Sequence, residues 1–148
     1  MTTRGLLIAA RILLGSVFFL SGILKLLSPD AASGLILHLF PVTPTLAKTL
    51  TVILSVLEIA AGAMLVLKKS VPIAAMFSTA FLLASIFVGV ATLSDPVSCG
   101  CFGALTDSKT DEFFLLRNAF LFLISMVVLR SSLPDRIDTE SAHAPPLA

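Results

Sequence analysis

The chain is poor in charged residues and contains neither tryptophan nor tyrosine. Charged residues make up 13% of its 148 residues, whereas a soluble domain carries about 25%. Hydrophobic residues make up 57%, and the mean hydropathy is +1.04. These values exclude an ordinary soluble domain and indicate an integral membrane protein. Because the usual Trp and Tyr belt at the membrane surfaces is missing, the 11 phenylalanines are expected to serve there instead.

Two further scarcities exclude other classes of function. The net charge of +1 leaves no basic footprint for a nucleic-acid partner. The two histidines and two cysteines stand at unrelated spacings, so no zinc or other metal site is expected.

What the sequence does contain is long apolar runs, at about 6–27, 46–67, 71–93 and 113–129. As helices they are long enough to cross a hydrocarbon core of ~30 Å. The first run follows Arg4 as a signal peptide would, but it is longer than a usual signal sequence and more spans follow, so we reject that interpretation. The predicted fold class is an all-α integral membrane four-helix bundle over residues 1–130. A loop at 94–112 and a polar, disordered cytoplasmic tail at 131–148 complete the expected organisation.

A short additional helix is expected after the first span. Ser28 and Pro29 look like a helix start, and Pro41 closes the segment. Apolar residues then recur with helical spacing, at Ala32, Leu35, Ile36 and Leu39. This pattern predicts an amphipathic helix lying in the membrane interface, with a plain loop as the alternative.

The only two cysteines stand one residue apart, in Cys99-Gly100-Cys101-Phe102-Gly103. Cα atoms two residues apart are separated by roughly 5.5–7 Å, which overlaps the ~4.4–6.8 Å of a disulfide. A bridge across one residue closes almost no loop and would stabilise little, which favours redox chemistry over a structural bridge or idle thiols. Cys99 and Cys101 are therefore the candidate catalytic residues. Gly100, Phe102 and Gly103 are expected to shape the loop.

Glu58 is the sharpest polar residue inside a span. A bare carboxylate near the membrane midplane costs at least ~2.5–3.5 kcal/mol, so Glu58 must pair or stay protonated. Depth in the membrane favours Arg11 as its partner, side-chain direction favours Arg117, and Lys25 lies further out. Asn118 stands beside Arg117. Glu58 and its cationic partner form either a proton or quinone site or a structural ion pair. The structural ion pair is slightly favoured.

Small and polar residues recur on one face of each span, and these faces are expected to point into the bundle. They are Arg11, Gly15, Phe18, Gly22 and Lys25; Thr51, Ser55, Glu58 and Gly62; Ser78, Ser85, Gly89 and Thr92; and Asn118 and Ser125. The alternative is that the hydroxyl groups merely bond their own backbone.

An even number of spans puts both termini on one side of the membrane. That side carries Arg4, Arg11, Lys68, Lys69, Arg130 and Arg136, and the other carries Lys25, Lys48, Lys109 and Arg117. The bias predicts cytoplasmic termini in the cell membrane and an extracytoplasmic cysteine loop, where disulfide chemistry occurs.

Over about residues 5–130 the chain resembles the MauE branch of the DoxX-like membrane proteins. The resemblance is carried by Ser21-Gly22-x-x-Lys25, Glu58-x-x-x-Gly62, Cys99-Gly100-Cys101-Phe102-Gly103 and Arg117-Asn118. It implies a four-helix membrane protein associated with thiol redox. MauE is linked to maturation of the disulfide-rich small subunit of methylamine dehydrogenase, beside a thioredoxin-like partner, and DoxX relatives to quinone-linked oxidation of sulfur compounds.

The bundle is also similar in outline to the DsbB and vitamin K epoxide reductase group, which uses two cysteine pairs where this chain has one. A single pair suits exchange with a thioredoxin-like extracytoplasmic partner through a mixed disulfide. The expected function is therefore that of a membrane accessory protein for thiol–disulfide redox chemistry, a thiol–disulfide oxidoreductase if it is an enzyme. The alternative is a non-catalytic subunit or scaffold of a DoxX-type quinone-linked oxidoreductase. No cofactor is evident, a quinone is the one left open, and membrane lipid is the expected surrounding partner.

Overall fold

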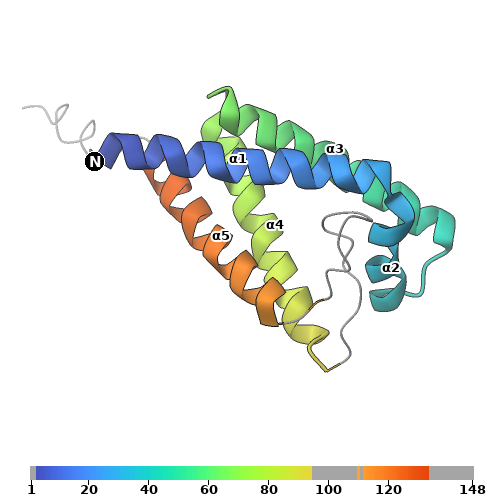
Figure 1. Cartoon of the computed structure of the whole chain (residues 1–148). Helices are drawn as coiled ribbons and strands as arrows, with labels where there is room; N and C mark the ends of the chain where they lie inside the picture. The colour runs from blue at the N-terminus through green and yellow to red at the C-terminus, as the bar shows by residue number, and fades with distance from the viewer. Residues whose placement is uncertain (1–2, 95–109, 111, 134–148) are drawn as a thin grey trace, which may run out of the picture.

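The computed structural model describes residues 3–94, 110 and 112–133, which form five α-helices. They are α1 (Thr3–Leu27), α2 (Pro29–Leu39), α3 (Pro44–Val66), α4 (Val71–Ala91) and α5 (Glu112–Ser132) (Figure 1). All but α2 are long and apolar enough to cross a membrane, and the described residues contain no strand. The predicted all-α membrane bundle with a short helix after the first span is thus confirmed. The predicted tail lies outside the described residues from residue 134 onward.

Proline starts three of these helices. Pro29, Pro44 and Pro72 occupy the first turn of α2, α3 and α4, where the missing amide hydrogen would have had no partner. Thr43 also caps α3, since its hydroxyl oxygen accepts a hydrogen bond from the Leu46 amide at 3.4 Å. The Ser-Pro and Thr-Pro pairs of the sequence therefore act as helix starts.

A tight turn joins α3 to α4. Lys68 has a φ of 61°, and the Lys69 amide donates to the Met64 carbonyl at 3.0 Å, a Schellman ending. Ser70 follows with a φ of 47°, and α4 begins at the next residue. Glycine is the usual residue at the left-handed position of such an ending, because a side chain is strained there.

α1 packs chiefly against α3, and glycines allow the two backbones to meet. A Cβ atom on Gly62 would lie 2.6 Å from the Gly15 carbonyl oxygen and from the Phe19 amide nitrogen. A Cβ atom on Gly22 would lie 2.7 Å from the Ser55 carbonyl oxygen. The contacting residues rise along one helix as they fall along the other, so the pair is antiparallel. Small residues are what such close packing in a membrane requires.

α4 packs chiefly against α5. A Cβ atom on Gly89 would lie 2.7 Å from a methyl group of Leu115, so the helices are close at this point too. Further along, the Thr79 and Ser125 hydroxyl groups share a hydrogen bond of 2.8 Å between the helices. Helices α4 and α5 are therefore held together both by close packing at Gly89 and by a hydrogen bond between side chains.

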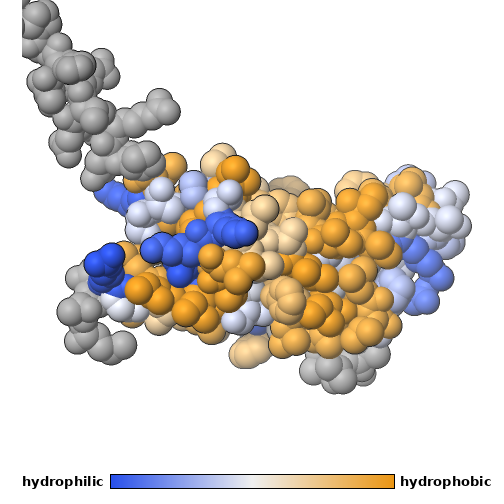
Figure 2. All heavy atoms as spheres, turned by 90° about the horizontal axis from the view of Figure 1, so that it is seen from above, coloured by the Kyte–Doolittle hydropathy of each residue, from blue (hydrophilic) through white to orange (hydrophobic). Residues whose placement is uncertain are grey.

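The two helix pairs are inclined to one another and diverge toward α2 (Figure 1). Where they meet, they bury an apolar core that includes Leu14, Leu65 and Leu82. Large apolar side chains also cover the outside, as with Phe87 at 75% exposed and Phe113 at 72%. Figure 2 shows hydrophobic side chains over much of the outer surface. A surface of this kind is what a lipid environment requires.

Candidate functional site

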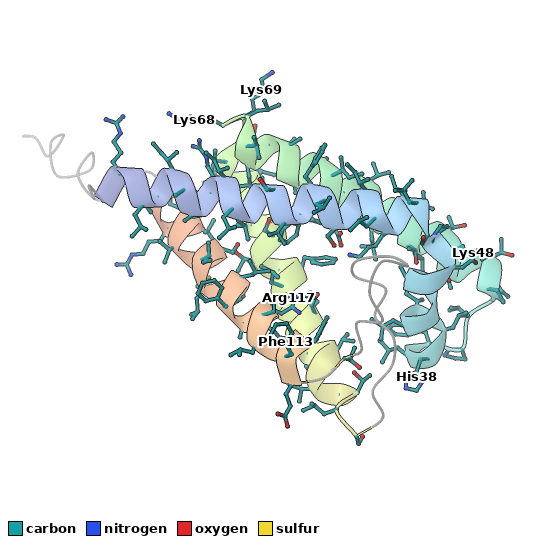
Figure 3. All side chains as sticks on the ribbon, in the orientation of Figure 1. His38, Lys48, Lys68, Lys69, Phe113 and Arg117 are labelled. Carbon is teal, nitrogen blue, oxygen red and sulfur yellow. The ribbon has the colours of Figure 1, made fainter. Side chains whose placement is uncertain are left out.

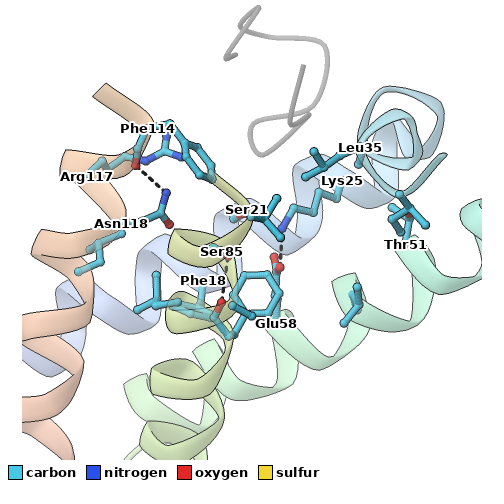
Figure 4. A pocket seen from close by; sticks show the side chains of 18 of the residues that line it. Phe18, Ser21, Lys25, Leu35, Thr51, Glu58, Ser85, Phe114, Arg117 and Asn118 are labelled. Carbon is cyan, nitrogen blue, oxygen red and sulfur yellow. Dashed lines mark hydrogen bonds and ion pairs between the residues drawn. The ribbon is translucent and has the colours of Figure 1, made fainter. Parts of the chain in front are cut away.

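A cavity of about 250 Å³ lies between the two helix pairs and is lined by all five helices (Figure 4). Most of its lining is aliphatic or aromatic, including Phe18, Phe81 and Leu121. The charged side chains among its lining residues are Lys25, Glu58 and Arg117. An apolar cavity with a few polar groups is the usual form of a small-molecule site.

Lys25 of α1 and Glu58 of α3 form a buried ion pair at this cavity. The Lys25 ammonium donates to Glu58 Oε1, with 8% of Lys25 and 1% of Glu58 exposed. The pair forms because Gly22 lets α1 approach α3 one turn away. On antiparallel helices both side chains lean toward their own N-termini, and hence toward each other. The ammonium also lies 5.1 Å from the centre of the Phe81 ring, a cation–π distance.

The second oxygen of the Glu58 carboxylate, Oε2, takes no part in the ion pair with Lys25. Glu58 Oε2 is buried and has no hydrogen-bond partner among the described residues. The Ser21 side chain, also on α1, hydrogen-bonds the same carboxylate, so two side chains of α1 hold Glu58.

Arg117 and Asn118 lie across the cavity, near the start of α5 (Figures 3 and 4). The Arg117 guanidinium lies 5.6 Å from the centre of the Phe114 ring. The Asn118 amide nitrogen donates to the Phe114 carbonyl at 2.8 Å, one turn back in the same helix. The structure thus brings Arg117 and Asn118 to the same cavity as the Lys25–Glu58 pair, but not to Glu58 itself.

Arg11 is elsewhere. It lines a separate hollow at the opposite end of the bundle, with Arg4 and Lys68. Depth in the membrane favoured Arg11 as the partner of Glu58 and side-chain direction favoured Arg117, but in the structure the partner is Lys25. The reason is the glycine contact, which sets the offset of α1 against α3, together with the length of the lysine side chain.

The expected inward faces are found in the structure. Gly15, Phe18, Gly22 and Lys25 are buried on α1, and the corresponding residues of the other long helices are buried or half-buried. Their hydroxyl groups nevertheless mostly bond the backbone of their own helix, as at Ser55 and Ser78. The Thr79–Ser125 bond, by contrast, joins hydroxyl groups of two helices.

Some residues that line the cavity were not predicted to do so from the sequence. Phe81 lies between Ser78 and Ser85 on the inward face of α4, but phenylalanine is equally common facing lipid, so its residue type did not mark it as a lining residue. The apolar face of α2, predicted to lie in the membrane interface, instead lines the cavity through Leu35, Leu39 and their neighbours. This face had a helical period, but the period alone does not say what covers it.

Cys99, Gly100, Cys101, Phe102 and Gly103 lie outside the described residues. The segment that contains them is nevertheless attached at both ends beside the cavity, because Val88 in the last turn of α4 and Phe114 in the first turn of α5 line it. Cys99 follows Ser94, the last described residue before the segment, by five residues. Such a length spans at most ~18 Å of extended chain.

A family model described as methylamine utilisation protein MauE matches residues 3–131. Comparison of the chain with curated proteins and with solved structures found no match. The matched range takes in the four apolar helices, the Lys25–Glu58 pair and the cysteine segment. Since the model spans most of the sequence, the chain belongs to the MauE family of methylamine utilisation proteins.

Proposed function

We propose that this protein carries out thiol–disulfide exchange with a thioredoxin-like extracytoplasmic partner. Cys99-Gly100-Cys101 is the exchanging dithiol, and the outcome is the maturation of disulfide-rich proteins such as the small subunit of methylamine dehydrogenase. The observation that carries the proposal is the position of the only two cysteines, one residue apart, in the segment that joins α4 to α5.

The exchange balances without a further reactant. A thiolate of the partner attacks one sulfur of the Cys99–Cys101 disulfide, a mixed disulfide forms, and the other cysteine leaves as a thiolate that takes up a proton. The second thiol of the partner then attacks the mixed disulfide and releases the first cysteine. Two electrons and two protons have passed from the partner's dithiol to the chain, and the reverse direction is the same chemistry. The relative reduction potentials decide which direction prevails.

The bundle supports this chemistry by being stable without it. Its helices are joined by glycine contacts, a buried ion pair and an apolar core, all outside the cysteine segment. A ring that spans one residue would add less than the ~2–4 kcal/mol of an ordinary disulfide. The disulfide can therefore open and close without loss of the fold.

Replacing both Cys99 and Cys101 with Ser tests the proposal. Expression and melting temperature should stay near wild type, whereas maturation of the disulfide-rich substrate in cells should stop. Each single Cys→Ser variant should trap a mixed disulfide with the partner, visible on a non-reducing gel and absent from the double variant. A fully active double variant would show that the redox function is wrong.

The proposed orientation puts both termini in the cytoplasm. The start of α1, the α3–α4 turn and the end of α5 share one end of the bundle, and the α4–α5 segment leaves from the other. Since the chain has no other cysteine, a membrane-impermeant maleimide reports on this segment alone. After mild reduction of intact cells it should label the chain fully, and labelling that needs permeabilised cells would refute the orientation.

A second candidate, a non-catalytic subunit or scaffold of a quinone-linked oxidoreductase, is favoured by the cavity. Its apolar lining and its Lys25 and Arg117 side chains suit a quinone ring, whose carbonyl oxygens accept hydrogen bonds. Activity that survives loss of both cysteines but is lost on filling the cavity, as in Ala84→Phe, would favour this candidate.

A further inference from the structure

We propose that the hollow at the end of the bundle opposite the cysteine segment binds the phosphate group of an anionic phospholipid. This basic hollow, of about 510 Å³, lies where the start of α1, the α3–α4 turn and the end of α5 meet. Its polar lining consists of Arg4, Arg11, Lys68, Ser70, Ser131 and Ser132. Figure 2 shows hydrophilic side chains gathered at this end of the molecule, and Figure 3 marks Lys68 and Lys69 there.

Among the residues that the structure describes, no carboxylate neutralises the positive charge of the basic hollow. The acidic residues among the described ones are Asp30, Glu58 and Glu112. Asp30 pairs with Lys48, and Glu58 with Lys25. Glu112 begins α5, so it lies about 28 Å along that helix from Ser131. Three cations thus face one hollow with no carboxylate of the described residues beside them.

Arg11 carries a buried hydrogen-bond donor that lacks an acceptor among the described residues. Its Nε is buried and has no hydrogen-bond partner among the described residues. A buried guanidinium nitrogen without an acceptor is unfavourable, and a phosphate oxygen is the acceptor that guanidinium geometry fits best.

Lys68 gives independent support. It occupies the left-handed position that closes α3, with a φ of 61°, where glycine would be free of strain. The chain therefore keeps a long cationic side chain at a position that favours glycine. Strain retained in this way is common at binding sites.

The neighbouring helix ends are compatible with an anion. α4 begins at the basic hollow, and Ser70 makes no side-chain hydrogen bond to cap it, so the positive end of the helix dipole is open. At the end of α5, the Ser131 and Ser132 hydroxyl groups donate to the carbonyls of Val128 and Leu129 at 2.9 and 2.8 Å. These carbonyl oxygens are thus already bonded.

The occupant is a lipid rather than a free ion because of the apolar part of the lining. Leu7, Ile8, Val71 and Val128 border the same hollow, at the end of helices that carry lipid-facing apolar surfaces. A phosphate with attached acyl chains satisfies both parts of the lining. Basic pockets between helix ends are a known form of headgroup site.

The test compares melting temperatures in detergent with and without added phosphatidylglycerol, using phosphatidylcholine as the neutral lipid. Far-ultraviolet circular dichroism is the readout, since the chain has no Trp or Tyr. Phosphatidylglycerol should raise the melting temperature of wild type, and phosphatidylcholine should not. The triple variant Arg4→Gln/Arg11→Gln/Lys68→Gln should lose this rise and bind phosphatidylglycerol on the order of a hundredfold more weakly, at about fivefold per cation.

Two controls make the result decisive. Lys48→Gln/Lys69→Gln/Arg130→Gln removes the same charge from exposed positions outside the basic hollow and should keep the rise. Lys68→Gly should raise the melting temperature without lipid, because the strain at Lys68 is relieved, yet reduce the response to phosphatidylglycerol. A purely structural Lys68 would not give these opposite changes.

The outcomes separate the lipid from its phosphate. An equal rise with inorganic phosphate at the same concentration would overturn the lipid part of the proposal and leave a phosphate site. An undiminished rise in the triple variant, or in Lys68→Gly if the triple variant does not fold, would overturn the site itself. None of these variants alters the cysteine segment, so the result is independent of the proposed redox function.

Discussion

Removal of the Glu58 charge should destabilise the bundle strongly. Glu58→Gln keeps the size of the side chain but leaves the Lys25 ammonium buried without its counter-charge. Breaking a buried ion pair by removing one partner typically costs about 3–5 kcal/mol. Because Lys25 borders the cavity, we expect the lower end, about 3 kcal/mol. For a chain of this length that corresponds to a fall of ~6–12 °C in melting temperature.

The assay is thermal unfolding in detergent followed by far-ultraviolet circular dichroism. Lys48→Met is the matched control, because Lys48 pairs with Asp30 but their side chains are 50% and 73% exposed. Loss of an exposed pair should cost less than about 1 kcal/mol. The double variant Lys25→Met/Glu58→Leu removes both charges together and should recover most of the lost stability, since neither charge is then left alone.

Two results would refute this reasoning. A Glu58→Gln variant that melts with wild type would mean that the ion pair does not hold α1 to α3. If the double variant Lys25→Met/Glu58→Leu were as unstable as Glu58→Gln, the loss of stability would come from altered packing and not from an unpaired charge. In the second case the glycine contacts at Gly22 and Gly62 would account for the stability of the pair.

The remaining predictions concern the two helix pairs. Gly62→Ala should lower stability by ~1–3 kcal/mol, because its Cβ would lie 2.6 Å from backbone atoms of α1; Gly34→Ala, with no atom within 4 Å of the new Cβ, should be neutral or slightly stabilising in the same melting assay. Ser125→Ala should cost about 0.6 kcal/mol through loss of its bond to α4, and more than Ser78→Ala, whose hydroxyl bonds its own helix. Equal losses at Ser125 and Ser78 would contradict a role for the bond between α4 and α5.

The helices and their inward faces could be predicted because both are local properties. An apolar run of membrane length has few alternatives to a helix, and small or polar residues at helical spacing can avoid lipid only by facing the bundle. Glu58 at 1% exposed and Ser125 at 0% follow this rule. No knowledge of the neighbouring helix is needed to reach these conclusions.

The partner of Glu58 and the cavity could not be predicted because both depend on how helices sit against one another. Depth estimates measure each residue from the middle of its own span, whereas the Gly22 contact fixes the actual offset between α1 and α3. The cavity also requires the inclination of the second helix pair and the placement of α2 against it. These are tertiary features with no periodic signal in the sequence.

The ion pair between α1 and α3 also bears on how the protein is made. Lys25 enters the membrane with the first helix, but its counter-charge is encoded 33 residues later. At synthesis rates of ~5–20 residues per second, the ammonium waits roughly 2–7 s for Glu58. During that interval α1 has an uncompensated charge and no α3 surface for its glycines to pack against. The nascent first span should therefore remain beside the insertion machinery until α3 has emerged, and a chain truncated before Glu58 should be a substrate for membrane quality control.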